Sequence, residues 1–373
     1  MRILVVDGHF PNKYTAWRNY ELNSLIENFE TDIFVYKGGV WAGIPYEFDY
    51  DFCNQNGRLD DYKILILDSK YNHLDKFNSG FDGTAWNNRH EGSYIFSRDG
   101  NFDPSQYDAI YHIFLGCYIR FNNDFRNISA DQVIHLYAGG GFTFDGQMEL
   151  PQYVNYISSH PVTSGILKSK NLRFIDCWTA PQAEKNEKLP FRHRKPKSKM
   201  VVSFSSMGYG SEKGDLKYIL IATLYRFLHP FSFVRFISIG NCKPSPFVKR
   251  FKPMDYKSLE EFYEERVHVS INPMSTQATN GFPLGLEYFK KGCVVLTTDP
   301  NRVVEHYEEQ LRPIVCTSIR EFIYEVHKLW LDSEYWNQES KRAQAFFHRY
   351  SSYSEQQAKV ISMILGNLST GLG

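Results

Sequence analysis

The segment that decides the fold reads NGFPLGLEYFKKGCVVLTTD over residues 280–299. It predicts a glycine-containing loop, a short helix that opens with Pro283 and carries Glu287, a stop at Gly292, and an apolar strand that ends in Asp299. Free backbone N–H groups at the start of such a helix attract a diphosphate, and a carboxylate one turn in can accept hydrogen bonds from two vicinal ribose hydroxyls. The segment therefore indicates a phosphate-and-ribose pocket in an α/β protein. The plainer alternative is an ordinary loop, helix and strand in which Glu287 is a solvated helix residue.

The rest of the chain repeats this alternation of short apolar runs and amphipathic stretches, which favours parallel sheets with crossover helices. In the first half, strands are expected over 3–6, 33–36, 63–67, 109–115, 132–137 and 154–157, with a helix over 15–28. In the second half, strands are expected over 200–205, 233–239 and 267–271, and helices over 215–228, 258–265, 319–331, 334–347 and 354–365. Residues 71–101 break the rhythm because they are polar, aromatic and glycine-rich, which is typical of a functional loop or an insertion.

The alternation is interrupted once, at a basic stretch that reads RHRKPKSK over residues 192–199. We therefore expect one α/β domain over 1–183, a basic linker over 184–199, a second α/β domain over 200–350, and a closing helix over 351–373 that can pack back on the first domain. The linker either joins the two domains and nothing more, or forms a basic patch for peripheral contact with anionic lipid or a lipid-linked acceptor.

The composition of the 373 residues narrows the class of protein further. The 42 basic and 42 acidic side chains cancel, so no overall field favours nucleic acid as a partner. The six cysteines are scattered with no C-x-x-C pair, and several lie in apolar runs, which suits free thiols in a reducing compartment. No stretch approaches the roughly 20 apolar residues that span a bilayer, and the apolar start over residues 1–7 is too short for a signal peptide. We expect a soluble, cytoplasmic protein.

The opening segment resembles the donor-binding motif of retaining, nucleotide-sugar-dependent glycosyltransferases of the GT-B fold, and of glycosyltransferase family 4 in particular. The resemblance implies two Rossmann-like α/β domains that face a cleft, followed by C-terminal helices. The family places a second glutamate on the donor ribose, which corresponds to Glu287, and a first acidic residue on the donor sugar, where this chain has Asn280 with a spacing one residue shorter. The donor-binding residues that the resemblance implies in this segment are Asn280, Gly281, Phe282, Pro283, Leu284 and Glu287.

A second matching motif, Lys213-Gly214, follows the first strand of the expected second domain. In the family this lysine contacts diphosphate oxygens, and an ammonium at that place stabilises the charge that develops on the leaving group. The resemblance therefore implies a catalytic role for Lys213, while an exposed lysine at a helix start is the plainer alternative. The family also has an arginine near the strand end, but this chain has none there. Ser206, Gly208 and the turn residue Met254 complete the expected donor site.

Residues at the strand ends of the first domain are candidates for contact with the acceptor or the diphosphate, because ligands bind at the carboxyl edge of an open parallel sheet. His160 follows one expected strand and can serve as an acceptor contact or a catalytic base, although a lone histidine is more often structural. The other candidates at these strand ends are Gly8, His9, Lys13, Tyr14 and Gly140. The plainer alternative is that these residues form glycine-rich or capped turns without contacting a ligand.

No metal or other cofactor is expected. Asp49 and Asp51 form the Asp-x-Asp pattern that can hold a divalent cation, but they lie in a polar aromatic loop without a matching nucleotide-binding pattern around it. The expected function is transfer of a sugar from a nucleotide diphosphate sugar to a glycan, lipid-linked or other acceptor, with retention and without a metal. Two alternatives are a binding or scaffold protein of the same fold without transfer activity, and an epimerase or phosphorylase of that fold.

Overall fold

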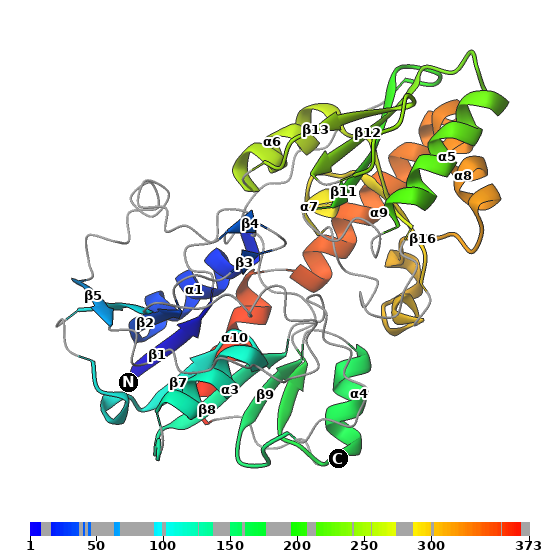
Figure 1. Cartoon of the computed structure of the whole chain (residues 1–373). Helices are drawn as coiled ribbons and strands as arrows, with labels where there is room; N and C mark the ends of the chain where they lie inside the picture. Colours follow the sequence, from blue (N-terminus) through cyan, green and yellow to red (C-terminus); the bar gives the residue numbers. More distant parts are fainter. Residues whose placement is uncertain are drawn as a thin grey trace. The chain divides into compact units, whose positions relative to one another are not determined.

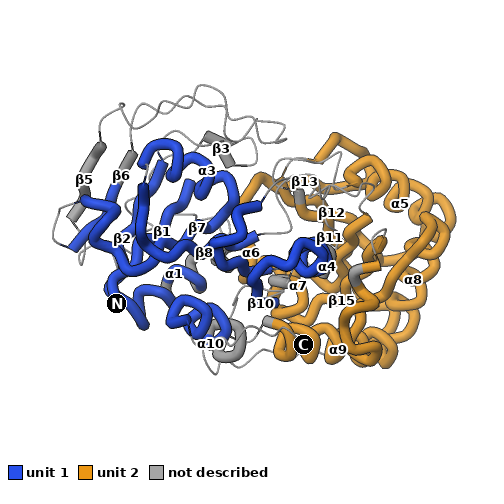
Figure 2. The backbone as a smooth tube through the Cα atoms, turned by 90° about the horizontal axis from the view of Figure 1, so that it is seen from below, with its two compact units in different colours: residues 1–181, 354–373 blue, residues 182–353 orange. Residues whose placement is uncertain are grey.

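The computed structural model describes most of the chain. The described residues are 1–8, 16–36, 40–41, 44–45, 63–67, 93–98, 102–125, 127–136, 150–158, 161–176, 195–206, 214–240, 242–254, 256–273, 286–299, 302–351 and 353–366. The chain divides into two compact units, which Figure 2 shows in different colours. Unit 1 comprises residues 1–181 and 354–373, and unit 2 comprises residues 182–353.

Unit 1 is built on an eight-stranded sheet in the order β10-β9-β8-β7-β1-β2-β6-β5. The strands are β1 (Arg2–Asp7), β2 (Glu30–Tyr36), β5 (Lys63–Leu67), β6 (Ser93–Ser97), β7 (Ala109–His112), β8 (Asp131–Leu136), β9 (Asn155–Ser158) and β10 (Phe174–Asp176). The six strands from β10 to β2 pair in parallel, whereas β6 pairs antiparallel with both β2 and β5. A separate pair, β3 (Val40–Trp41) and β4 (Ile44–Pro45), is also antiparallel.

Helices cover both faces of this sheet, as the alternation of buried residues along β1 requires. Ile3 and Val5 pack with α1 (Ala16–Asn28) and α10 (Tyr353–Ile364), whereas Leu4 and Val6 pack on the side of α3 (Leu115–Asp124). Figure 2 shows α1 and α10 on one side of the sheet and α3 on the other. A third cluster joins α3 and α4 (Pro161–Ser169) to β8 and β9. A 3₁₀ turn, η2 (Pro104–Gln106), precedes β7.

Unit 2 contains a six-stranded sheet in the order β13-β12-β11-β14-β15-β16. All of its strand pairs are parallel. The strands are β11 (Met200–Ser206), β12 (Val234–Gly240), β13 (Val248–Phe251), β14 (Val269–Asn272), β15 (Val294–Thr297) and β16 (Ile314–Val315). In chain order this is the 3-2-1-4-5-6 arrangement of a doubly wound nucleotide-binding sheet.

The helices of unit 2 also lie on two faces. The helices are α5 (Asp215–Leu228), α6 (Tyr256–Arg266), α7 (Leu286–Lys290), α8 (Ile319–Leu331) and α9 (Ser333–Ser351), with 3₁₀ turns η4 (Val303–His306) and η5 (Glu309–Leu311). Residues of α5, α8 and the buried Trp336 of α9 share one apolar core with alternate residues of β11. Tyr263 of α6 and Tyr288 of α7 pack ring to ring at 4.3 Å. Figure 1 shows α5 and α8 side by side in this unit.

Several details differ from the sequence-based expectations. β5 was expected to continue a parallel series, but it pairs antiparallel with β6, and β6 lies inside the stretch that was expected to be irregular. The strand expected over 109–115 ends at His112, and α3 begins at Leu115. The unit boundaries fall at 181/182 and 353/354, beside the expected 183/184 and 350/351.

The linker and the cysteines can be followed in part. The described end of the basic linker is joined to α8, because the Lys197 N–H donates to the Trp330 carbonyl and Trp330 Nε1 donates to the Ser198 carbonyl. The four described cysteines, Cys117, Cys242, Cys293 and Cys316, are buried free thiols. No helix among the described residues is long and apolar enough to span a membrane.

Candidate functional site

The strand order of unit 2 reverses between β11 and β14, and this reversal defines the candidate site. The chain leaves β11 toward β12 and leaves β14 toward β15, so the two connections diverge at the carboxyl edge of the sheet, where sheets of this order bind ligands. Residues 207–213 follow β11 and lead to α5, and residues 274–285 follow β14 and lead to α7. Both sequence motifs, Lys213-Gly214 and the segment from Asn280, therefore belong to the connections that flank the reversal.

Gly214 joins these two connections directly. It has a left-handed backbone, with φ of +84°, and it is the N-cap residue of α5. A Cβ atom at this position would lie 2.3 Å from the carbonyl oxygen of Pro273 and 2.9 Å from its carbonyl carbon. Because Pro273 directly follows β14, only glycine lets the start of α5 approach the end of β14 this closely. The position of Gly214 therefore requires the absence of a side chain where the start of α5 meets the end of β14.

A buried carboxylate lies at the first residue of α5. Gly214 offers no side chain that could cap the helix. Asp215 is buried, and its carboxylate accepts from the backbone N–H groups of Leu216 (2.7 Å) and Lys243 (3.4 Å). This carboxylate therefore ties the start of α5 to the chain that leaves β12. The dipole of a 14-residue helix favours negative charge at this end.

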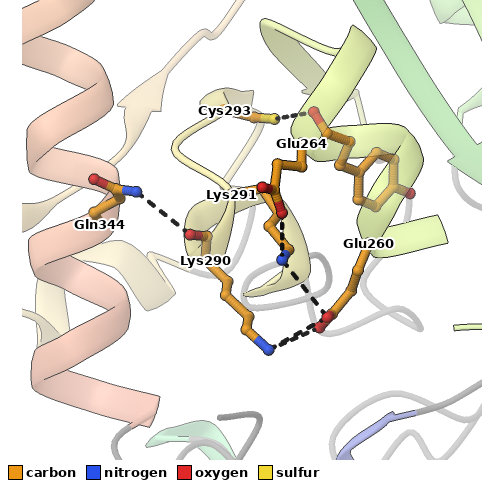
Figure 3. Close-up of polar contacts among 7 residues, drawn as sticks. Glu260, Glu264, Lys290, Lys291, Cys293 and Gln344 are labelled. Carbon is orange, nitrogen blue, oxygen red and sulfur yellow. Dashed lines mark hydrogen bonds and ion pairs between the residues drawn. The ribbon is translucent and has the colours of Figure 1, made fainter. Parts of the chain in front are cut away.

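Two buried lysines at the end of the short helix α7, which contains Glu287, form ion pairs with α6, as Figure 3 shows. The Lys290 ammonium is 1% exposed and lies 3.1 Å and 3.3 Å from the two carboxylate oxygens of Glu260 on α6. The Lys291 ammonium lies 2.9 Å from Glu264 and 3.8 Å from Glu260. Buried charges of this kind are stable only when paired, so the pairs fix the rotation of α7 about its axis.

The far end of α7 is fixed to α9. The N–H of Gly292 donates to the Phe289 carbonyl and that of Cys293 to the Tyr288 carbonyl, which is the Schellman arrangement of a helix end. Gly292 has φ of +67°, as this arrangement requires. Its carbonyl accepts a hydrogen bond of 2.6 Å from the Ser340 hydroxyl of α9. The Gly292 stop predicted from the sequence is therefore confirmed.

Unit 1 has a corresponding reversal between β1 and β7, since the chain leaves β1 toward β2 and leaves β7 toward β8. Asp7 and Gly8, at the end of β1, are buried. The backbone N–H of Ile113, just past β7, donates to the Val6 carbonyl at 3.1 Å. Gly8 therefore lies at the carboxyl edge of the sheet, and its contact with a ligand stays a prediction.

A buried polar cluster lies just beneath this edge, and the sequence analysis did not identify it. His135 Nδ1 of β8 lies 2.6 Å from Glu21 Oε1 of α1 and 3.1 Å from the Tyr111 hydroxyl of β7. The Tyr111 hydroxyl also hydrogen-bonds to Glu21 Oε1. All three side chains are almost fully buried. The cluster fixes α1, and with it the end of the β1–α1 connection, against the carboxyl halves of β7 and β8. A histidine inside an apolar strand run was its only sequence signal.

A second histidine beneath the same edge has a different environment. His112, the last residue of β7, is buried, and its Nε2 lies 2.9 Å from Gln132 Oε1. Burial lowers the pKa of His112 to about 3. This histidine is therefore neutral at physiological pH and acts as a structural residue.

Most of the predicted site residues lie outside the described part of the structure. Glu287 and Ser206 are placed by their backbones, in α7 and as the last residue of β11. Met254 is half-buried and follows β13. The predicted residues that lie outside the described residues are Lys213, His160, Asn280, Gly281, Phe282, Pro283, Leu284, Gly208, His9, Lys13, Tyr14 and Gly140. Asp49 and Asp51 also lie outside them, and among the described residues no cluster of His, Cys, Asp and Glu could hold a metal ion.

Comparison with solved structures identifies the fold. Sucrose-phosphate synthase from Thermosynechococcus elongatus matches with a TM-score of 0.61 and 9% identity, over 98% of this chain and 99% of that chain. HepE from Anabaena in complex with UDP-glucose matches with a TM-score of 0.60 and 12% identity, over 99% and 100% of the two chains. The pneumococcal O-GlcNAc transferase GtfA in complex with UDP and GlcNAc gives 0.57 and 10%, over 99% of each chain.

No model of a known protein family matches the sequence, and no curated protein does. The structural matches cover nearly the whole of each chain at low identity, so they establish the fold. The chain has the GT-B fold of these glycosyltransferases, with two α/β units and C-terminal helices, and the fold class expected from the sequence is confirmed.

Proposed function

We propose that this protein is a nucleotide-sugar-dependent glycosyltransferase, which moves a sugar from a nucleotide diphosphate to a glycan, lipid-linked or other acceptor. One observation carries the proposal: the two family-like motifs flank the strand-order reversal of unit 2, where Gly214 packs against Pro273. A sheet of this order binds nucleotides at that reversal. The fold supports the same conclusion, because the matched structures of HepE and GtfA contain UDP-glucose, and UDP with GlcNAc, respectively.

The donor is proposed to bind to unit 2. The Glu287 carboxylate accepts hydrogen bonds from the ribose hydroxyls, and the anchored α7 holds the backbone of this residue in place. Asn280 meets the donor sugar, and the N–H groups from Gly281 onward meet the diphosphate. Lys213 lies on the diphosphate as well, because it precedes the N-cap of α5. Phe282, Pro283, Leu284, Ser206, Gly208 and Met254 complete the donor site, which follows the pattern of glycosyltransferase family 4.

The acceptor is proposed to bind to unit 1 at the carboxyl edge of its sheet. Gly8, His9, Lys13 and Tyr14 belong to the connection after β1, and Gly140 to the connection after β8. His160 follows β9 and directly precedes α4, so it belongs to the same edge. We assign His160 as an acceptor contact or base.

The proposed reaction retains the configuration of the sugar. The bond between the anomeric carbon and the diphosphate oxygen breaks, and a bond to the acceptor oxygen forms on the same face. The acceptor hydroxyl proton passes to the departing phosphate oxygen, or to His160 where this residue acts as the base. In neither case is a protein nucleophile needed. The Lys213 ammonium and the N–H groups at the helix starts stabilise the negative charge of the diphosphate, so that no metal is required.

The proposal is tested by measuring nucleotide release from UDP-, GDP-, dTDP- and CMP-sugars, with and without EDTA. We expect release from one donor, unchanged by EDTA, and a product whose anomeric configuration in NMR spectra equals that of the donor. Loss of activity with EDTA would contradict the metal-free assignment alone. Binding of a nucleotide sugar without turnover would favour the scaffold alternative, which Asn280 and the missing family arginine make the second candidate.

Substitutions separate the two proposed donor contacts. Glu287→Ala should weaken donor binding at least about tenfold, because hydrogen bonds to a charged group contribute about 1.5–3 kcal/mol. Lys213→Ala should lower turnover on the order of a hundredfold with little change in thermal stability, as expected for a group that stabilises the leaving charge. Glu261→Gln, on the exposed face of α6, is the matched control and should change neither quantity. Wild-type donor affinity in Glu287→Ala, or wild-type turnover in Lys213→Ala, would remove that residue from the site.

A further inference from the structure

The outward face of α5 is apolar, which is unusual for a helix at the surface of a protein. Its exposed positions follow a helical spacing and continue into the turn and strand start that come next. From Leu216 to Phe233 none of the exposed positions carries a charged side chain, and Phe227 and Phe231 are 71% and 92% exposed. We call this surface the α5 apolar face; its residues are Leu216, Leu220, Leu224, Phe227, Leu228, Phe231 and Phe233.

The connection between β12 and β13 explains why this face is uncovered. In a doubly wound sheet, successive crossovers in one direction lie on the same face, so a helix between β12 and β13 would pack beside α5. The described residues of this connection, 242–247, contain no helix. On its other flank α5 packs against α8 (Figure 1). The apolar residues of α5 therefore lack the neighbour that such a sheet normally supplies.

A basic segment runs along the border of the α5 apolar face. The Lys243 N–H donates to Asp215 at the start of α5, and the Phe247 ring lies 5.8 Å from the Phe227 ring near the end of α5. These two contacts place residues 243–247 alongside the helix. The segment 242–254 contains four exposed cations and no acidic residue; the cations are Lys243, Lys249, Arg250 and Lys252. Arg250 is on the same face of β13 as Val248, which packs in the core with α5, whereas Lys249 lies over the Phe251 ring on the face of α6.

We propose that the α5 apolar face, with the cations Lys243 and Arg250 beside it, docks onto the surface of an anionic lipid bilayer. Leucine and phenylalanine side chains that project beside a row of Lys and Arg match the two features of such a surface, an apolar interior under a layer of negative charge. A second copy of the chain fits less well. A symmetric contact that included Phe247 would bring both basic segments into one interface, where like charges repel.

The proposal is tested by co-sedimentation of the full chain with vesicles of phosphatidylcholine alone, or with about one third phosphatidylglycerol. Binding is expected only to the anionic vesicles, and it should weaken as salt is raised. Phe227→Ser/Phe231→Ser should weaken binding at least about tenfold, through lost apolar burial. Lys243→Gln/Arg250→Gln should weaken it by about thirtyfold, which is about fivefold for each cation removed.

Two matched controls accompany these variants. Leu365→Ser removes an exposed apolar side chain from unit 1, and Lys195→Gln/Lys197→Gln removes two exposed cations from the linker. Both should bind the vesicles as the wild type does. All of these side chains are exposed, so the thermal unfolding of the variants should equal that of the wild type. Phe231→Ser alone, beyond the end of α5, serves if the double variant unfolds early.

Three results would overturn the proposal. The first is failure of the wild-type chain to bind anionic vesicles. The second is equal loss of binding in the linker variant and in Lys243→Gln/Arg250→Gln, since that would show a nonspecific attraction. The third is a wild-type dimer in light scattering without vesicles that becomes a monomer in Phe231→Ser, together with no binding to vesicles. The α5 apolar face would then be an interface between copies of the chain.

Discussion

Replacement of Gly214 by alanine tests the geometry on which the candidate site depends. An alanine must adopt the left-handed backbone of this position, which costs about 1–2 kcal/mol for a residue with a Cβ atom. Its Cβ would also lie 2.3 Å and 2.9 Å from two backbone atoms of Pro273, so the start of α5 and the end of β14 must separate. Overlap of this kind costs a further ~1–3 kcal/mol. The sum is about 2–5 kcal/mol, which for a unit of this size lowers the midpoint of thermal unfolding by about 4–20 °C.

We expect Gly214→Ala to lower turnover by a larger factor than its loss of thermal stability alone would cause. The separation moves the two connections that carry Lys213 and Asn280, and displacement of binding groups by about 1 Å can lower turnover on the order of a hundredfold. Differential scanning calorimetry and nucleotide release, measured on the same preparation at a temperature where the variant is folded, distinguish the two effects.

The chain supplies two matched glycine controls. Gly366 has φ of +69° but open space around a new Cβ, so Gly366→Ala incurs only the backbone cost. Gly165, inside α4, has nothing within 4 Å of a new Cβ, so Gly165→Ala should stabilise unit 1 by about 0.5–1 kcal/mol. If Gly214→Ala is no less stable than Gly366→Ala and keeps wild-type turnover, the close approach to Pro273 does not hold the site together.

Three further predictions concern ionisable side chains. Lys290→Met should destabilise unit 2 by about 3 kcal/mol and raise the KM for the donor, because Glu260 loses its closest ammonium; the double variant Lys290→Met/Glu260→Gln should recover most of the stability in chemical denaturation, and additive losses would contradict the pairing. Glu264→Gln should cost less than about 1 kcal/mol, because this carboxylate is 41% exposed. The pKa of His112 is lowered from 6.5 to about 3 by burial, so between these values the unfolded chain binds a proton that the folded chain does not. The free energy of unfolding should therefore fall by up to about 1.4 kcal/mol for each pH unit from this group as pH decreases below 6.5, and a pH profile of His112→Gln with the same slope as the wild type would refute this.

The elements with strong local signals were predictable from the sequence. α5 and α8 have the same bounds in the structure as in the sequence analysis, Asp215–Leu228 and Ile319–Leu331. In α8 the buried residues recur at helical spacing, and Ser318 caps the start by accepting from the Glu321 N–H. Such signals lie within one turn of the helix end that they determine, so the sequence alone reveals them.

The elements that depend on distant partners were not predictable. β6 reads SYIFS in a polar region, and it becomes a strand by pairing antiparallel with β2 and β5. The stretch from Ala109 to Leu115 is apolar almost throughout, so its periodicity does not show that the strand ends at His112 and that α3 begins at Leu115.

The candidate site shows the same division. Glu287 and Lys213 were predicted from motifs and stay predictions, whereas the backbone conformations of Gly214 and Gly292 could be expected from their places at helix ends. The anchoring of α7 was not foreseeable, because lysines are rarely buried and Lys290 and Lys291 read as solvated residues in the sequence. Their carboxylate partners lie about thirty residues earlier, on α6. The cluster of Glu21, Tyr111 and His135 likewise joins three elements that only the fold brings together.

Hydrogen exchange measured by mass spectrometry, with and without UDP, GDP or dTDP, tests the central claim most directly. If the donor site lies at the strand-order reversal of unit 2, one of these nucleotides should slow exchange in the peptides that cover residues 207–214 and 274–290, and leave the strands of unit 1 unchanged. Protection confined to residues 1–181, or no protection by any of the three nucleotides, would contradict the account.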